Sequence, residues 1–370
     1  MKNTFGNSVA ITLFGESHGK VIGAVLDGIA PGIRIEEKRV EEALEKRRPK
    51  GSISTSRSEK DRFEIVSGIF NGYTTGTPIC VVIKNEDVDD SVYEEMDGRV
   101  RPSHADYTAH IKYNGFEDYR GGGHFSGRLT AALVAAGAIA QAELDAVNIK
   151  IGTHIKKCAG VSDRSFENIE DDVDVLSSLD FPALDKDAEE KMKKQIERAS
   201  KDMDSVGGIT ETAVLNVPCG IGEPFFDSVE SAISHAMFSI PAVKGVEFGS
   251  GFAISDMLGS QANDEFRYSD GNVVTKTNNN GGINGGITNG MPVTFSCAIK
   301  PTPSIGKTQN TIDIKKQEDC QLSIKGRHDP CIVHRACHVI NALAAITVCD
   351  LLAQKYGTNF PNILNSGDNT

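Results

Sequence analysis

Four short segments of this 370-residue chain combine glycine, arginine and histidine in a mixture that suits chemistry better than packing. They are residues 15–19 (GESHG), 101–106 (RPSHAD), 121–128 (GGGHFSGR) and 327–331 (RHDPC), and they hold four of the nine histidines. Glycine lets a backbone approach a ligand closely, arginine binds carboxylates and phosphates with paired N–H groups, and histidine exchanges protons near neutral pH. We therefore expect the segments to form one composite site for an anionic ligand.

His18 and His104 are the strongest candidates for proton transfer. His18 lies between two glycines directly after a predicted strand, and His104 follows Arg101 and a stiffening proline. Asp106 could orient the His104 imidazole or close its loop. A lone histidine at a turn is usually structural, but the glycines and charged neighbours favour a catalytic role for both.

The three glycines at 121–123 precede an alanine-rich segment that is predicted to be helical. Free N–H groups at a helix N-terminus bind anions, although a plain cluster of loop glycines is the alternative. The spacing does not fit the dinucleotide fingerprint, because Ser126 takes the place of its last glycine. Residues 305–308 (IGKT) do not complete a P-loop either, because Pro301 stands where the first glycine is required.

His334 and His338 stand four residues apart on a predicted helix, which raises the question of a zinc site. The glutamate of the H-E-x-x-H motif is missing, and Arg335 would place a cation beside the supposed ligands. Residues 15–19 (GESHG) match the letters of the G-x-S-x-G motif, but a serine hydrolase is not supported, because a strand and not a helix is predicted directly after them. We therefore expect no metal.

Composition narrows the class of protein. A formal net charge of −12 disfavours binding to nucleic acid or to an anionic membrane surface. The eight cysteines include no C-x-x-C pair, and the first ten residues have no long apolar stretch, so we expect reduced thiols in a cytoplasmic protein. The apolar run over 131–140 is too short to cross a membrane and predicts a buried helix instead.

Periodicity predicts strands and helices that alternate along the chain. Strands are expected over 9–14, 21–26, 78–83, 211–217 and 293–299, and helices over 36–48, 129–147, 227–238 and 333–354. We expect a mobile basic loop over 50–60 and long loops over 84–120. The spacing of apolar residues over 185–203 predicts a peripheral amphipathic helix.

A weak echo between residues 24–33 and 213–221 suggests two related β-α halves. We predict an α+β fold with one domain over 1–365 and a short polar tail over 366–370.

The four segments together, in this order, resemble the chorismate synthase family over nearly the whole chain. Weaker matches at 204–208, 242–245, 281–283 and 300–302 support the resemblance. It implies a β-α-β sandwich assembled as a homotetramer. It also implies a lyase of aromatic amino acid biosynthesis that converts 5-enolpyruvylshikimate 3-phosphate to chorismate and phosphate. The reaction would be a 1,4 (trans) elimination that requires reduced FMN without net redox change.

The resemblance implies a role for each residue that matches the family pattern. His18 would assist departure of the phosphate, His104 would protonate the reduced flavin, and Asp329 would help the flavin to accept the ring proton. The implied substrate-binding residues are Arg47, Arg48, Ser126, Arg128 and Arg327. The implied flavin-binding residues are His124, Phe125, Ser126, Ala242, Gly285, Lys300, Pro301, Thr302, Pro303, Ser304 and Arg327.

Some positions depart from the family pattern. His124 and Phe125 replace an arginine and a small residue, and Leu129 and Asn341 each replace a glutamate. Two other functions stay open: a flavoenzyme with net redox chemistry, and an anion- or flavin-binding sensor without chemistry. The source of reduced flavin also stays open, between NADP-dependent reduction by this chain and an external flavin reductase.

Overall fold

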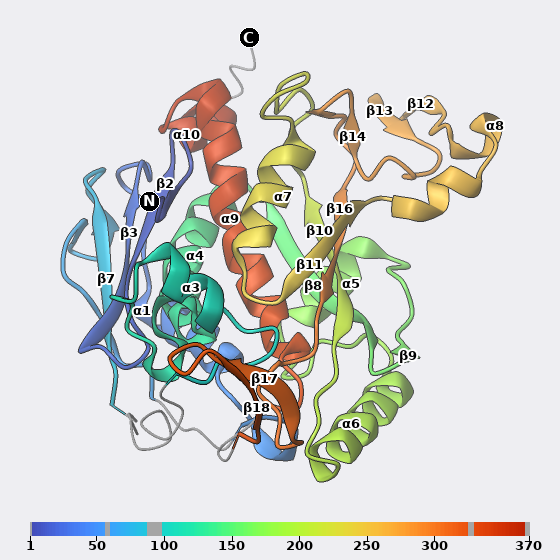
Figure 1. The fold of residues 1–370 in the computed structure, drawn as a ribbon. Helices are drawn as coiled ribbons and strands as arrows, with labels where there is room; N and C mark the ends of the chain where they lie inside the picture. The colour runs from blue at the N-terminus through green and yellow to red at the C-terminus, as the bar shows by residue number, and fades with distance from the viewer. Residues whose placement is uncertain (1, 56–59, 87–97, 325–328, 367–370) are drawn as a thin grey trace.

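Two five-stranded antiparallel sheets enclose a layer of helices in the computed structural model, which describes residues 2–55, 60–86, 98–324 and 329–366 (Figure 1). The first sheet has the order β1 (Thr4–Phe5), β2 (Ala10–Gly15), β3 (Val21–Asp27), β7 (Ile79–Lys84) and β4 (Phe63–Ile65). The second has the order β11 (Val243–Phe248), β16 (Val293–Ile299), β10 (Gly208–Leu215), β8 (Lys150–Cys158) and β9 (Val161–Ser162).

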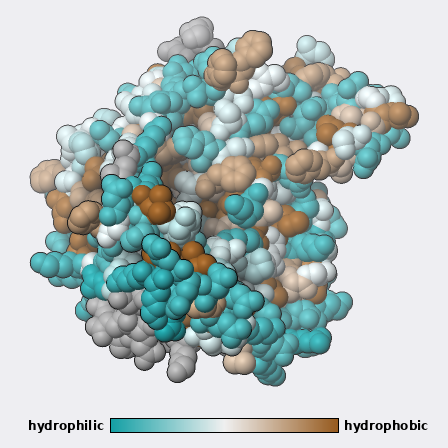
Figure 2. Space-filling view, viewed as in Figure 1, coloured by the Kyte–Doolittle hydropathy of each residue, from teal (hydrophilic) through white to brown (hydrophobic). Residues whose placement is uncertain are grey.

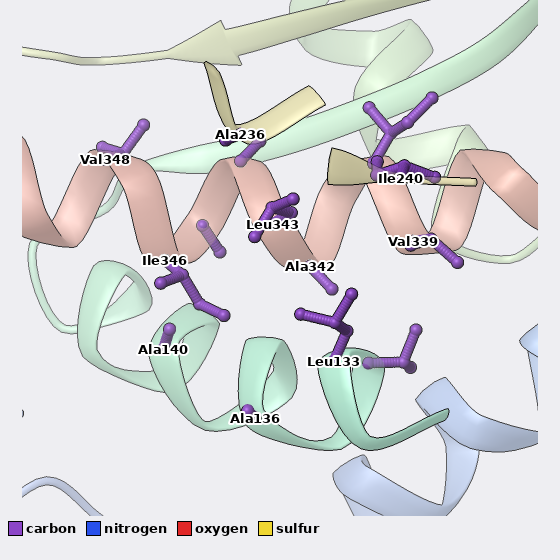
Figure 3. Packing of buried hydrophobic residues seen from close by; sticks show 14 of the residues in the cluster. Leu133, Ala136, Ala140, Ala236, Ile240, Val339, Ala342, Leu343, Ile346 and Val348 are labelled. Carbon is purple, nitrogen blue, oxygen red and sulfur yellow. The ribbon is translucent and has the colours of Figure 1, made fainter. Parts of the chain in front are cut away.

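Helices α4 (Thr130–Asp145) and α9 (Val333–Tyr356) pack against each other between the sheets, and they confirm the buried helices predicted there. A Cβ atom at Gly137 would lie 2.3 Å from the Cβ of Ala342, so only glycine permits this approach of the two backbones. Figure 3 shows Leu133 of α4 pointing toward α9 beside Ala342, and Ala140 next to Ile346.

Two further helices, α1 (Glu37–Arg47) and α7 (Val229–Ser239), pack against this central pair.

Shorter elements surround this core. The remaining helices of the described residues are α3 (Asp106–Lys112), α5 (Ile169–Leu176), α6 (Lys186–Lys201), α8 (Gly259–Ala262) and α10 (Phe360–Ser366). Four hairpins are β5–β6 (Ile69–Phe70, Tyr73–Thr74), β12–β13 (Phe266–Ser269, Asn272–Thr275), β14–β15 (Ile283–Asn284, Ile287–Thr288) and β17–β18 (Gln309–Asp313, Glu318–Leu322). Short 3-10 turns are Gly51–Ile53, Arg120–Phe125, Gly127–Leu129 and Gly251–Asp256.

The predicted strands and helices are present, with end shifts of up to three residues. The peripheral helix is α6, which begins at an Asp185 cap and buries Met192 and Ile196. Several elements escaped prediction, among them β8, the longest strand of the described residues, and α3, which lies inside the predicted loop region. Residues 56–59 of the predicted mobile loop lie outside the described residues, as do 367–370 of the predicted tail, whose first residue ends α10.

The long helix α9 also holds the N-terminal segment in place. Asp350 accepts hydrogen bonds from the backbone N–H groups of Asn7, Ser8 and Val9, at 3.0, 2.6 and 2.9 Å. By length and composition α9 could cross a membrane, but 89% of its most apolar window is buried inside the protein. It is therefore the core helix around which the two ends of the chain meet.

A charged network lies within the second sheet and explains why β8 was missed. The buried His154 contacts Asp163 through Nδ1 at 3.0 Å and Glu211 through Nε2 at 3.1 Å, and Lys156 donates to Glu211 at 2.9 Å. Burial lowers the pKa of His154, but the two carboxylates outweigh that effect and hold the pKa above its usual value. The strand thus carries polar residues where a sequence pattern would demand apolar ones.

Replacing His154 by glutamine is expected to cost more stability at pH 6 than at pH 9. A raised folded-state pKa contributes stability that is fully present below the unfolded pKa, which is about 6.5, and that is lost as the pH rises through the folded value. Urea unfolding of both proteins at the two pH values measures the difference. A cost of replacement that is the same at both values would contradict the ion pairs.

Candidate functional site

A cavity of about 890 Å³ opens on the face seen in Figure 2, where the surface is hollowed near its centre. Its walls come from the first sheet, the end of α1, the 121–128 segment, α7, residues 300–304 and the start of α9. Twelve of the predicted site residues line it: Arg47, His104, His124, Phe125, Ser126, Arg128, Ala242, Lys300, Thr302, Pro303, Ser304 and Asp329. Segments more than 280 residues apart in sequence therefore meet at one cavity.

The other predicted residues lie elsewhere. His18, Arg48 and Pro301 are not in the wall; Arg48 and Pro301 each adjoin a residue that is, whereas His18 lies against Gly121, which is not a wall residue. Gly285 lies in the β14–β15 turn and does not line this cavity. Arg327 falls outside the described residues.

The buried carboxylate of Asp61 forms ion pairs with three arginines of the site. It contacts Nη1 of Arg47 at 3.5 Å and Nε of Arg48 at 3.6 Å, and it forms a closer ion pair with Arg128. Arg47 also donates to Thr130 and to the carbonyl of Gly127. Asp61 and the side chains of Arg47 and Arg128 are each at most 6% exposed, so the ion pairs are shielded from solvent.

His104 is held by a carboxylate two residues away. Asp106 contacts Nδ1 of His104 at 2.7 Å and accepts from Nε and Nη2 of Arg101 at 2.8 and 2.7 Å. Burial alone would raise the pKa of Asp106, but the hydrogen bonds from Arg101 and His104 lower it well below its usual range. Because an ionised carboxylate only accepts, Nδ1 donates and Nε2 is left to exchange protons.

His18 lies behind the glycine segment, on a turn that is bonded to it. The amide of Ser17 donates to the carbonyl of Gly123 at 3.1 Å, and the Ser17 hydroxyl donates to the carbonyl of Arg120 at 3.2 Å. A Cβ atom at Gly121 would lie 2.2 Å from Cδ2 of His18 and 2.4 Å from its Nε2. The missing side chain at position 121 is what makes room for the imidazole.

Replacing Gly121 by alanine is expected to displace the His18 ring and to lower turnover by about 100-fold. The added methyl group would overlap the ring, and the φ of +60° at this position is already unfavourable for alanine. Gly127→Ala is the matched control, because nothing lies within 4 Å of a Cβ atom there. Steady-state kinetics of the two variants measure the effect, and wild-type turnover in Gly121→Ala would contradict it.

Asp329 forms an ion pair with Arg335, and Arg335 in turn donates through Nε to the carbonyl of Arg47 at 2.8 Å. Burial raises the pKa of Asp329 above its usual value, although the charges of Arg335 and Arg47 partly oppose this effect. Among the lysines, arginines and carboxylates of the wall, cations outnumber carboxylates by six to two: Lys2, Arg47, Arg128, Lys244, Lys300 and Arg335 against Asp61 and Asp329. The cavity is therefore suited to an anion.

The opposite wall has features that fit a flavin phosphate. Burial and the neighbouring Lys244 both lower the pKa of Lys300, so two cations lie close together there. The hydroxyl of Thr302 is buried without a hydrogen-bond partner among the described residues. Leu133, Val339 and Leu343 supply apolar surface for a ring system. The residues present thus fit both halves of FMN.

Three residues of the site were missed by sequence reasoning: Asp61, Asn85 and Arg335. Asp61 and Asn85 stand in charged stretches without a recognisable motif, and both contact Arg128. Arg335 was noted only as an argument against zinc. The spacing of Arg101, His104 and Asp106 was the one local signal that pointed to a contact in the site.

The cavity, its cations and the histidines of its wall have the character of a small-molecule enzyme. The chain belongs to the chorismate synthase family, since the family model "Chorismate synthase" matches residues 9–353. The chorismate synthase of Pyrococcus abyssi is 48% identical over 347 residues, which cover 94% of this chain and 96% of that protein. That of Korarchaeum cryptofilum is 45% identical with the same coverage.

A solved structure described as "Crystal Structure of Chorismate Synthase" has the same fold. It superposes with a TM-score of 0.77 at 30% identity and covers 98% of this chain and 96% of its own. The predicted family and the α+β class are thereby confirmed.

Proposed function

We propose that this protein is a phosphate lyase that converts 5-enolpyruvylshikimate 3-phosphate to chorismate and phosphate. The reaction is a 1,4 (trans) elimination with reduced FMN in aromatic amino acid biosynthesis. The observation that carries the proposal is the convergence of Arg47, Arg128, His104 and Asp329 on one cavity in a member of this family. The substrate bears a phosphate and two carboxylates, and buried arginines bind such groups by charge-assisted hydrogen bonds.

The residues of the chain divide the proton transfers among them. His18 donates a proton to the phosphate oxygen as the C–O bond breaks, which lowers the charge on the leaving group. His104 exchanges a proton through Nε2, while Asp106 fixes its tautomer. A bound reduced FMN would lend electron density to the substrate. Asp329, which lies in the wall with a raised pKa, would assist removal of the substrate's ring proton.

Phosphate release from 5-enolpyruvylshikimate 3-phosphate, with chemically reduced FMN and without oxygen, tests the proposal. Many turnovers per flavin are expected. One phosphate per flavin consumed would indicate net redox chemistry instead, and no release at all would leave only an anion- or flavin-binding sensor.

We also propose a homotetramer, which the exposed apolar side chains support. An arm that carries α8 and the β12–β13 hairpin projects from the body of the molecule (Figure 1) and presents hydrophobic residues at the surface (Figure 2). They include Phe252, Leu258, Phe266 and Tyr268, of which Phe252 is 83% and Tyr268 82% exposed. Patches of this kind mark interfaces. Light scattering should give four times the mass of one chain.

We further propose that the enzyme works in the cytoplasm, with reduced flavin supplied either by an external reductase or by NADP-dependent reduction on this chain. All eight cysteines are free thiols, which suits a reducing compartment. NADPH oxidation by the purified chain with FMN tests the second part, because an intrinsic NADP-dependent reductase would consume NADPH without any added protein.

A further inference from the structure

Asn85 connects two parts of the site that are far apart in sequence. It directly follows β7 and is half-buried. Its Nδ2 donates to the backbone carbonyls of Glu16 at 3.0 Å and Gly19 at 2.8 Å. Its Oδ1 accepts from Nε of Arg128 at 3.1 Å. One amide therefore uses both of its N–H groups on the turn that carries His18 and its oxygen on the arginine.

Other bonds join the His18 turn to the glycine segment: the amide and the hydroxyl of Ser17 donate to the carbonyls of Gly123 and Arg120, but these bonds do not involve the Arg128 side chain. The His18 turn has its own short bond, from the amide of Gly19 to the carbonyl of Glu16 at 3.0 Å. Arg128 is fixed from its other sides by Asp61 and by the carbonyl of Lys84. The contacts of Asp61 fall on arginines and do not reach the His18 turn. Asn85 is the side chain described here that contacts both.

We propose that Asn85 is a positioning residue, whose amide holds the His18 turn and the Arg128 guanidinium in one fixed mutual orientation. The inference rests on the proposed function, in which His18 protonates the phosphate that Arg128 binds. His18 and Arg128 must then contact the same phosphate group. A misplacement of about 1 Å at a reacting centre can lower the rate by about 100-fold.

The chemistry of the side chain explains why an asparagine is needed. An amide provides two donors for the two carbonyls and an acceptor for the guanidinium. Aspartate has nearly the same shape and would still accept from Arg128, but it cannot donate to Glu16 and Gly19. Alanine loses all three bonds. The two replacements therefore separate the contact with Arg128 from the contacts with the turn.

The test compares Asn85→Ala, Asn85→Asp and Asp61→Asn with the wild-type enzyme loaded with FMN. Phosphate release gives kcat and KM, and calorimetry gives the affinities for inorganic phosphate and for FMN. Asn85→Ala is expected to lower kcat by about 100-fold and to weaken phosphate binding by about tenfold, with FMN affinity unchanged. Asn85→Asp should lower kcat similarly. Asp61→Asn, which loosens the arginines alone, should act mainly on KM and on phosphate affinity.

Asn341→Ala is the control variant that should lower the stability of the protein without moving the His18 turn relative to Arg128. Asn341 accepts a partly buried hydrogen bond from Thr153 at 2.6 Å, and it does not line the cavity. Its variant should have a lower thermal midpoint and an unchanged kcat. Equal losses of kcat in Asn85→Ala and Asn341→Ala would show that Asn85 is only structural, and wild-type kcat in both Asn85 variants would also overturn the inference.

The outcomes also separate this inference from the proposed function. If the wild-type enzyme releases no phosphate, the proposed function fails. The calorimetric arm then decides about Asn85, because an unchanged affinity for inorganic phosphate in Asn85→Ala would overturn the inference and a tenfold loss would support the link to Arg128.

Discussion

Replacing Asp329 by asparagine is expected to lower turnover by about 1,000-fold while FMN still binds. The carboxyl lies in the cavity wall, and burial raises its pKa, which makes its ionised form a better base than an exposed aspartate. Asparagine keeps the shape but cannot take up a proton. Arg335 would keep its bond to the carbonyl of Arg47, so the wall itself should survive. Single-turnover phosphate release with reduced FMN measures the effect.

Asp172→Asn is the matched control for that experiment. Asp172 is also a largely buried carboxylate paired with an arginine, Arg164, but it lies on α5, outside the cavity wall. Its replacement should leave turnover unchanged. More than a tenth of wild-type turnover in Asp329→Asn would refute the role given to Asp329. If the ionised carboxylate is the active form, activity should also fall at a higher pH than for an ordinary aspartate as the solution is acidified.

Replacing Arg128 by methionine is expected to reduce kcat/KM by about 1,000-fold, or about 4 kcal/mol of transition-state binding. A buried guanidinium that binds phosphate contributes charge-assisted hydrogen bonds, and methionine fills the space without supplying any. Removing one partner of a buried ion pair usually destabilises a protein by about 3–5 kcal/mol. Here Asp61 keeps Arg47 and Arg48 as partners, so we expect a smaller loss of stability.

The loss of activity in Arg128→Met should therefore exceed the loss of stability. Substrate titration gives kcat and KM, and urea unfolding gives the free energy of unfolding. Arg39→Met is the control, because Arg39 forms an exposed ion pair with Asp145 on the outside of the molecule. It should leave both quantities nearly unchanged. An Arg128→Met enzyme with wild-type kcat/KM would remove Arg128 from the substrate site.

Much of the fold was predictable because most of its elements obey simple rules. The helices over α4 and α9 are almost entirely apolar, and β16 carries an uninterrupted apolar and small-residue pattern, so composition alone identified them. Strand β8 was not predictable in this way. Its central His154 is stabilised by Asp163 and Glu211, which come from other parts of the chain, and no local pattern reveals such partners.

The site was predictable where its contacts are local. The His104–Asp106 pair could be anticipated from its spacing. Asp61 and Asn85, in contrast, contact Arg128 from 67 and 43 positions away, and neither belongs to a motif that would indicate the contact. The glycines at 121–123 were expected to offer amides to an anion at a helix N-terminus. Gly122 and Gly123 are instead buried, and α4 begins at Thr130. Anion binding by those amides stays a prediction, while room for His18 is what the structure shows.

The bonds from Arg335 to Arg47 and from Asp350 to residues 7–9 have a consequence for how the enzyme is made. They join the first and last parts of the chain, so a ribosome that is still translating α9 holds a protein with neither a finished cavity wall nor an anchored N-terminal segment. Synthesis proceeds at about 5–20 residues per second, so the early strands wait for seconds beside an unfinished core. The active site can therefore be completed only after α9 has been synthesised, and we expect any nascent fragment that stops before α9 to be inactive.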